Sequence, residues 1–223
     1  EYTSSKYFEN ETQLTVPRQL KKAVEYANAL VFQESEQTFA YSGMGTTLSA
    51  IAVLGNWAYI AQVGDSRIYL LRDGVGLLQI TYDHSLVAEQ IRSGLIDESE
   101  ANQHSLKNLI TRAVGIKEDI EVDLFALKLK KNDTLLLCSD GLSNMVPDPL
   151  IEACLQNNTL EEASQTLLQY SLEAGGQDNI TLITLRITDS PPCTKYQYGA
   201  KLSPPSKGGI FARLFYFLRS NDS

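Results

Sequence analysis

The sequence is poor in cysteine and has no long hydrophobic run. Its three cysteines are Cys138, Cys154 and Cys193, an odd number whose spacing matches neither a metal knuckle nor a disulfide framework. Cysteines used in this way indicate a reducing compartment, so we expect a cytoplasmic protein. No apolar stretch is long enough to span a bilayer, and no signal peptide is recognisable.

Positive charge is also scarce. Lys and Arg number 19 against 27 Asp and Glu, which gives a net charge of −8 and a pI near 4.8. This balance argues against non-specific nucleic-acid binding, which needs a basic surface, and it suits a protein whose acidic sites hold cations. The length of 223 residues is enough for one sizeable core, so we expect a single domain with a tail.

Hydrophobic periodicity predicts a mixed α and β chain. Short apolar, β-branched runs between residues 46 and 80 are separated by Gly-Asn, Gly-Asp-Ser and Asp-Gly turn signals, which predict an antiparallel meander. A polar helical segment at 85–104 is expected to act as a flap. The other expected elements are helices at 16–35, 147–155 and 160–173, strand-like runs at 106–115, 121–129 and 133–139, and a last strand at 179–187.

Three aspartates stand beside small residues at the ends of strand-like runs. They are Asp65 in GDSR, Asp140 in SDGL and Asp178 in QDN. Small neighbours allow sharp turns, so carboxylates far apart in sequence can converge, and Mg²⁺ and Mn²⁺ prefer such oxygen ligands. A single Asp beside Gly is more often a turn or a helix cap, so the spacing alone leaves both interpretations open.

A series of motifs carries a family resemblance. GMGTTLSAIAV, VGDSRIYLLRDG, LLQITYDHS, NLITRAVG, DTLLLCSDGLSNMV and GGQDNITLITLRI follow one another over roughly residues 14–187. In this order they resemble the metal-dependent protein serine/threonine phosphatases of the PPM type, especially compact bacterial members. The resemblance implies an α+β fold, a four-layer α-β-β-α sandwich of two antiparallel sheets flanked by helices. We therefore expect a phosphatase domain at 1–188 and a Pro/Gly/Ser-rich linker and tail at 189–223.

The resemblance also implies the chemistry of the site. It implies hydrolysis of phosphoserine and phosphothreonine in proteins by a metal-activated water, with Mg²⁺ or Mn²⁺ as cofactor. Asp140 and Asp178 would be ligands of the catalytic metal pair, and Asp65 with Asp140 would hold a third ion. The implied partners are phosphorylated protein substrates and a Ser/Thr kinase counterpart, in a signalling role.

The sequence departs from the family near its beginning. Members carry an Arg that binds the phosphate and a DGMGG-type motif whose Asp bridges both metals, and neither is present here. Residue 1 is Glu1, and the two methionines are Met44 and Met145. We therefore expect the N-terminal strands and a metal-ligand motif to be missing, with impaired activity. The alternative is a catalytically inactive phosphatase-fold module that binds or regulates a partner.

Other features have a functional and a structural interpretation. His84 could be an acid or base, but a structural turn residue is favoured because the sequence identifies no partner for it. Arg67 could contact phosphate, although an ion pair with a neighbouring carboxylate is the favoured interpretation. The terminal run IFARLFYFLR is too short to span a membrane, and membrane contact is less favoured than a docking peptide or a frayed end.

Overall fold

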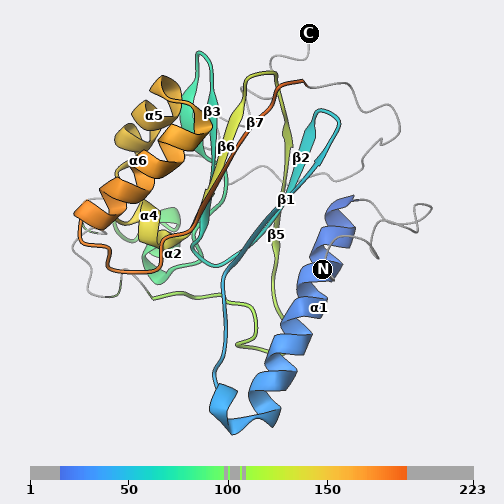
Figure 1. Ribbon diagram of the computed structural model, residues 1–223. Helices are drawn as coiled ribbons and strands as arrows, with labels where there is room; N and C mark the ends of the chain where they lie inside the picture. The colour runs from blue at the N-terminus through green and yellow to red at the C-terminus, as the bar shows by residue number, and fades with distance from the viewer. Residues whose placement is uncertain (1–15, 98–99, 101–105, 107–108, 190–223) are drawn as a thin grey trace. The chain divides into compact units, whose positions relative to one another are not determined.

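The computed structural model describes residues 16–97, 100, 106 and 109–189 (Figure 1). These residues form two compact units that alternate along the sequence, and each is described by itself below. The first unit takes its described residues from 16–51, 60–66 and 82–124, and the second takes them from 52–59, 67–81 and 125–189. Within the described part of the chain, no helix has the length and apolar character needed to cross a membrane. The predicted tail, apart from Asp189, lies outside the described residues.

Helix α1, Val16–Gln37, is the longest element of the first unit and extends two residues beyond its predicted end. Pro17 is compatible with the first turn because the backbone N–H that it lacks would have no partner inside the helix. One face of α1 supplies Val24, Leu20 and Val31 to a small core. The remaining members of this core are Ala61, Val63, Val114 and Val122, with Leu48, Ile120 and Leu124 packed against them.

Two short helices also belong to the first unit. The 3₁₀ helix η1, Phe39–Tyr41, follows α1, and helix α2, Leu86–Arg92, lies in the segment predicted to be a flap. The Ser85 hydroxyl caps α2 by accepting the Ala88 N–H at 3.3 Å. Residues 98–99 and 101–104 of the predicted flap lie outside the described residues, so its role as a flap stays a prediction.

A buried asparagine joins α1 to the loop that follows residue 114. Asn28 is 1% exposed, and its side-chain amide donates to the carbonyls of Lys117 and Glu118, each at 2.9 Å. Its Oδ1 accepts the N–H of Gly115 at 2.7 Å. Gly115 has φ of +90°, and a Cβ there would lie 2.3 Å from Val31 Cγ1, so a side chain at this position would push the loop away from the helix.

We expect Asn28→Ala to destabilise the protein by about 2 kcal/mol, because it leaves a buried N–H and two carbonyls without their partner. The measurement is the midpoint and slope of urea unfolding followed by far-UV circular dichroism. Gln33→Ala, the same loss of an amide at an exposed position of α1, is the matched control and should change stability by less than about 0.5 kcal/mol. Equal effects of the two substitutions would contradict the structural role given to Asn28.

The strands form two sheets. Strands β1 (Leu48–Leu54), β2 (Trp57–Val63) and β5 (Asp123–Lys128) make the first sheet, in the order β1-β2-β5. Strands β3 (Arg67–Arg72), β4 (Gly76–Gln79), β6 (Thr134–Cys138) and β7 (Leu182–Arg186) make the second, in the order β4-β3-β6-β7. The predicted α+β class is confirmed.

The predicted meander over residues 46–80 is wrong in one respect. The hairpin partners are right, but the chain changes sheet at Gly64-Asp65-Ser66, and β3 pairs with the distant β6 instead of β2. Turn signals report local pairing only, whereas sheet membership depends on contacts between segments far apart in sequence. The strand expected at 106–115 is also wrong, because its described residues form only isolated bridges, Ile110 with Ser85 and Val114 with Thr46.

Three helices belong to the second unit. They are α4 (Asp140–Ser143), α5 (Asp148–Asn157) and α6 (Leu160–Glu173), and α5 and α6 lie side by side against the second sheet (Figure 1). Helix α6 has its predicted bounds because Thr159 and Glu162 form a reciprocal capping box at its start. The core between helices and sheet consists of Tyr69, Leu71, Leu136, Cys138, Leu142, Val146, Ile151, Cys154, Leu155, Ala163 and Leu167.

A buried ion pair ties the second sheet to the turn before β6. Arg72 and Asp133 are 4% and 2% exposed, and the guanidinium donates to both carboxylate oxygens, at 2.8 and 2.6 Å. Arg72 also donates to the Lys128 carbonyl at 2.8 Å, and Asp133 accepts the Lys130 N–H at 2.7 Å. The two charges therefore have each other and a backbone group as partners, which is the condition for burying such a pair.

Candidate metal centre

Asp140 and Asp178 are brought together by the register of β6 and β7. Cys138, the last residue of β6, lies opposite Leu182, the first residue of β7. Asp140 follows β6 as the first residue of α4, and Asp178 lies just before β7. The strand pairing therefore places two carboxylates at the same end of the sheet, although they are 38 positions apart in the sequence (178 − 140).

Ser139 hydrogen-bonds the segment after β6 to the segment before β7. Its N–H donates to the Thr181 carbonyl at 2.9 Å, and its hydroxyl accepts the Thr181 N–H at 3.0 Å. The same hydroxyl donates to the Asn179 carbonyl at 2.9 Å. Gly141 allows this close approach, because a Cβ there would lie 2.5 Å from the Asn179 carbonyl oxygen. These contacts hold the backbone that carries Asp178 against the backbone that carries Asp140.

The electrostatics of the pair suit a cation. Burial raises the pKa of Asp140 above its usual value, and the negative charge of Asp178 raises it further. The Gly141 N–H and the positive charge of Arg67 offset part of this rise. Asp140 is partly buried and Asp178 is exposed. A divalent ion stabilises two carboxylates that repel each other, so the residues present fit Mg²⁺ or Mn²⁺.

The pair does not form a complete cage by itself. Among residues 16–97, 100, 106 and 109–189, no group of three or more His, Cys, Asp or Glu side chains is placed to hold a metal ion. Mg²⁺ commonly binds through one or two carboxylates and keeps several waters, so a carboxylate pair is compatible with its ordinary coordination.

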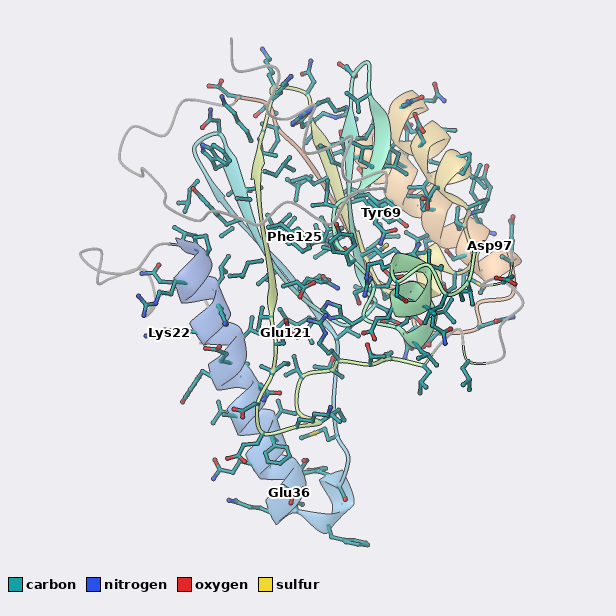
Figure 2. The ribbon with its side chains drawn as sticks, turned by 180° about the vertical axis from the view of Figure 1, so that it is seen from behind. Lys22, Glu36, Tyr69, Asp97, Glu121 and Phe125 are labelled. Atoms are coloured by element: carbon teal, nitrogen blue, oxygen red, sulfur yellow. The ribbon has the colours of Figure 1, made fainter. Side chains whose placement is uncertain are left out.

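Arg67 is held by a hydroxyl that the sequence did not identify. Its Nη1 donates to the Tyr69 hydroxyl at 3.0 Å, and that hydroxyl donates to Asp148 Oδ1 at 3.1 Å. Tyr69, labelled in Figure 2, is fully buried, and burial raises the pKa of its phenol. The positive charge of Arg67 lowers the pKa of Asp140, as is usual for an arginine near a carboxylate. The hydrogen bonds through Tyr69 to Asp148 orient the Arg67 side chain.

Asp65 and His84 lie in the first unit. Asp65 occupies the turn between β2 and β3, and His84 is fully buried, as favoured from the sequence for a structural residue. The partners of His84 are the N–H of Gly64 and the carboxylate of Asp123, and neither was recognisable from the sequence. Because Asp65 belongs to one unit and Asp140 with Asp178 to the other, their predicted convergence stays a prediction.

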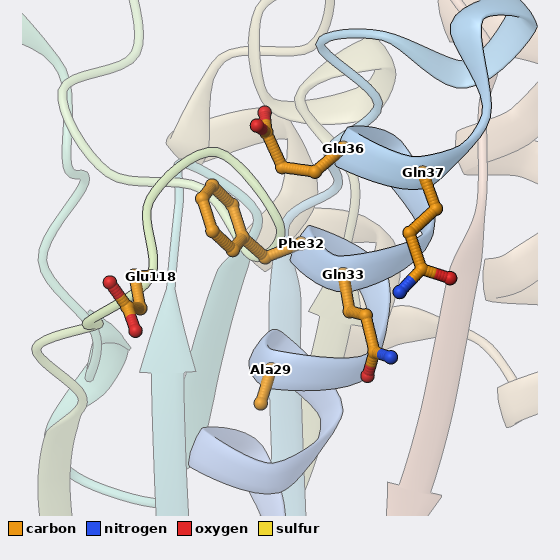
Figure 3. A pocket seen from close by; sticks show the side chains of 6 residues that line it. All are labelled: Ala29, Phe32, Gln33, Glu36, Gln37 and Glu118. Carbon is orange, nitrogen blue, oxygen red and sulfur yellow. The ribbon is translucent and has the colours of Figure 1, made fainter.

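Helix α1 borders a hollow whose lining differs from the Asp140 and Asp178 pair. Its volume is about 330 Å³, and Figure 3 shows the Phe32 ring and the Glu36 and Glu118 carboxylates at its wall. Ala29, Gln33 and Gln37 complete the lining. This lining contains no Arg or Lys to receive a phosphate, so the carboxylate pair at β6 and β7 is the better candidate site.

We expect Gly141→Ala to weaken Mn²⁺ binding by roughly tenfold, because the added methyl group forces Asn179 and the adjoining Asp178 away from Asp140. Isothermal titration with MnCl₂ measures the change. Ser143→Ala is the matched control in the same helix: it removes a buried hydroxyl that has no hydrogen-bond partner among the described residues, and should leave the affinity unaltered. Unchanged binding by folded Gly141→Ala would contradict this geometry.

Comparison with known proteins identifies the family of the chain. A family model described as Protein phosphatase 2C matches residues 3–175. The chain is 43% identical over 165 residues to the serine/threonine phosphatase stp of Listeria monocytogenes serotype 4b, a match covering 74% of this chain and 65% of that protein. The chain thus spans less than two thirds of this curated relative.

Solved structures give the same result for the fold. The serine/threonine phosphatase of S. agalactiae matches with a TM-score of 0.72 and 37% identity, covering 76% of this chain and 69% of that one. The catalytic domain of the serine/threonine protein phosphatase PstP, solved in complex with two manganese ions, matches with a TM-score of 0.72 and 36% identity. This second match covers 81% of this chain and 75% of that one. The two antiparallel sheets and their helices fit the predicted sandwich fold.

Proposed function

Because the chain belongs to the protein phosphatase 2C family, we propose that it forms part of a metal-dependent enzyme that hydrolyses phosphoserine and phosphothreonine in proteins. The observation that carries this proposal is the Asp140 and Asp178 pair, fixed by Ser139 and placed in a family whose members include a manganese-bound phosphatase. A phosphoric monoester is a dianion that resists attack by ordinary nucleophiles, so a cation-binding site is the feature this reaction needs.

The proposed cofactor is Mg²⁺ or Mn²⁺, in two or three positions. When bound, such ions neutralise phosphate charge and lower the pKa of water toward 7. In this proposal the chain supplies carboxylate oxygens from Asp140 and Asp178, which lie close enough to interact, and Asp65 is a further proposed ligand. Arg67, oriented by Tyr69, adds a fixed positive charge near Asp140.

The proposed partners are phosphorylated proteins, with a Ser/Thr kinase that makes the substrates as counterpart. A signalling role and a cytoplasmic location are part of the same proposal, and the acidic composition gives no reason to add a nucleic acid. Contact of the C-terminal run with a membrane stays a less favoured prediction.

The decisive assay measures phosphate released from a phosphothreonine peptide in excess MnCl₂ at neutral pH. We expect turnover that depends on Mn²⁺ and is lost in Asp178→Asn. Mn²⁺ binding without turnover would favour the alternative of an inactive binding module. The same assay on a chain extended at its N-terminus tests the prediction of impaired activity, because equal turnover by both chains would reject it.

A further inference from the structure

The turn that carries Asp65 is supported by buried polar groups. Gln62 is fully buried, and its amide donates to the carbonyls of Gly64 and Ser66, at 3.1 and 2.7 Å. The Thr47 and Ser66 hydroxyls lie 2.8 Å apart, and Ser49 donates to Gln62 Oε1 at 2.6 Å. Buried hydrogen bonds of this kind hold the backbone of the turn in one conformation.

His84 makes two further hydrogen bonds to this turn, both with Gly64. The Gly64 N–H donates to its Nδ1 at 3.0 Å, and the His84 N–H donates to the Gly64 carbonyl at 3.0 Å. Both polar groups of one glycine are therefore held by one residue. Because Nδ1 accepts a hydrogen bond it carries no proton, so the ring is neutral with its proton on Nε2.

Asp123 and Arg112 select this tautomer. Nε2 of His84 lies 3.1 Å from Asp123 Oδ2, so the negative charge of that carboxylate favours a proton on Nε2. Arg112 Nη1 donates to the other oxygen, Oδ1, at 2.8 Å. Burial raises the pKa of Asp123, but the interactions with His84 and Arg112 outweigh it and leave the pKa below its usual value. The carboxylate stays charged and keeps the His84 proton on Nε2.

His84 directly precedes the segment that the sequence predicts to be a flap. The Thr111 N–H donates to the His84 carbonyl at 2.8 Å, and the neighbouring Ser85 caps helix α2. His84 therefore joins the Asp65 turn to the first turn of α2 through bonds within one unit.

We propose that His84 is a positioning residue: its Nδ1, with the proton held on Nε2 by Asp123 and Arg112, fixes the Gly64 peptide and with it the direction of the Asp65 carboxylate toward a divalent ion. This inference rests on the proposed function, because it takes Asp65 as a metal ligand. In this inference, His84 of the motif YDHS takes no part in phosphate hydrolysis itself. It orients Asp65, a residue of the motif GDSR.

Two amide substitutions of His84 separate positioning from general packing. An Asn side chain places its oxygen at about the reach of Nδ1, whereas a Gln side chain reaches the place of Nε2 and leaves the Gly64 N–H without an acceptor. We expect His84→Gln to weaken Mn²⁺ binding by about 10- to 100-fold and His84→Asn by only about threefold, as for other residues that orient a metal ligand. Isothermal titration with MnCl₂ measures both, after circular dichroism has shown that each variant is folded.

Asp65→Asn is the reference variant. If it weakens Mn²⁺ binding while His84→Gln does not, the positioning role is rejected and the metal assignment stands. If Asp65→Asn leaves Mn²⁺ binding unchanged, Asp65 is no ligand, and both the metal assignment of Asp65 and this inference fail. Equal losses in His84→Gln and His84→Asn would also reject the role given to Nδ1.

The tautomer gives a readout that needs no metal and no substitution of His84. The chain has two histidines, so a long-range ¹H–¹⁵N spectrum contains two imidazole patterns, and His104→Gln assigns them. We expect His84 to show a proton on Nε2 and a bare Nδ1 at neutral pH, together with slow hydrogen exchange at the Gly64 N–H. A proton on Nδ1 would overturn the inference.

Discussion

Without metal, Asp178→Asn should stabilise the folded protein slightly, and with metal it should remove most of the stabilisation that Mn²⁺ gives. Asp140 and Asp178 repel each other in the metal-free state, and this repulsion is one cause of the raised pKa of Asp140. Because the pair is partly exposed, its removal should be worth less than about 1 kcal/mol.

In the presence of Mn²⁺, Asp178→Asn should lower the stability of the folded protein relative to the unsubstituted chain. At a hundredfold excess over the dissociation constant, a ligand that binds only the folded state stabilises it by about 2.7 kcal/mol. For a chain of this size, this corresponds to a rise in Tm of roughly 5–10 °C in the unsubstituted protein. We expect little or no rise in Asp178→Asn, measured by thermal unfolding with and without MnCl₂.

The exposed carboxylate Asp119 provides the control, since Asp119→Asn removes one charge without touching the pair. That variant should keep the full Mn²⁺ response. An equal response in Asp178→Asn and Asp119→Asn would show that Asp178 holds no ion. A loss of stability in metal-free Asp178→Asn would show that the two carboxylates do not oppose each other.

Arg72→Met should destabilise the protein more than Asn28→Ala does. It leaves Asp133, 2% exposed, as a buried carboxylate that has lost both guanidinium bonds. Breaking a buried pair from one side costs about 3–5 kcal/mol, which corresponds to a fall in Tm on the order of 10 °C. Trp57, the only tryptophan, lies in the same unit, so its fluorescence in urea follows unfolding where the pair is located.

Adding Asp133→Asn to Arg72→Met should restore part of the stability that Arg72→Met loses. The double variant has no unpaired buried charge, and an Asn oxygen can still accept the Lys130 N–H. A double-mutant cycle should give a coupling energy above about 2 kcal/mol. Lys21→Ala is the control, because the pair of Lys21 with Glu25 is 3.6 Å long and exposed, and its loss should cost less than about 0.5 kcal/mol. Additive effects at Arg72 and Asp133 would contradict the pairing.

Local features of the fold were predictable. Helix α6 has its predicted bounds because its capping box involves residues three positions apart, and Gly175 and Gly176, with φ of +122° and +54°, follow its end. Helix α1 follows from the spacing of its apolar residues. The meander was misassigned because a hairpin turn constrains two neighbouring strands and carries no information about which sheet a third strand joins.

The candidate site was predictable in part. The motifs named Asp140 and Asp178 as candidate metal ligands, but they gave no indication of Ser139, whose hydroxyl hydrogen-bonds the two segments to each other. Nothing in the sequence indicates that Asp123 is a partner of His84, or that Tyr69 orients Arg67. These contacts join residues whose side chains have no periodic relation along the chain.

The sequence by itself determined most of the helices and strands and their approximate bounds, because periodicity, capping and turn residues act over a few positions, and it named the carboxylates proposed as metal ligands. Only the tertiary structure decided which of those residues meet. The pairing of β6 with β7 puts Asp140 beside Asp178, and the burial of His84 between Gly64 and Asp123 fixes its tautomer. Both depend on contacts between distant segments, whose energies appear only once the chain has folded.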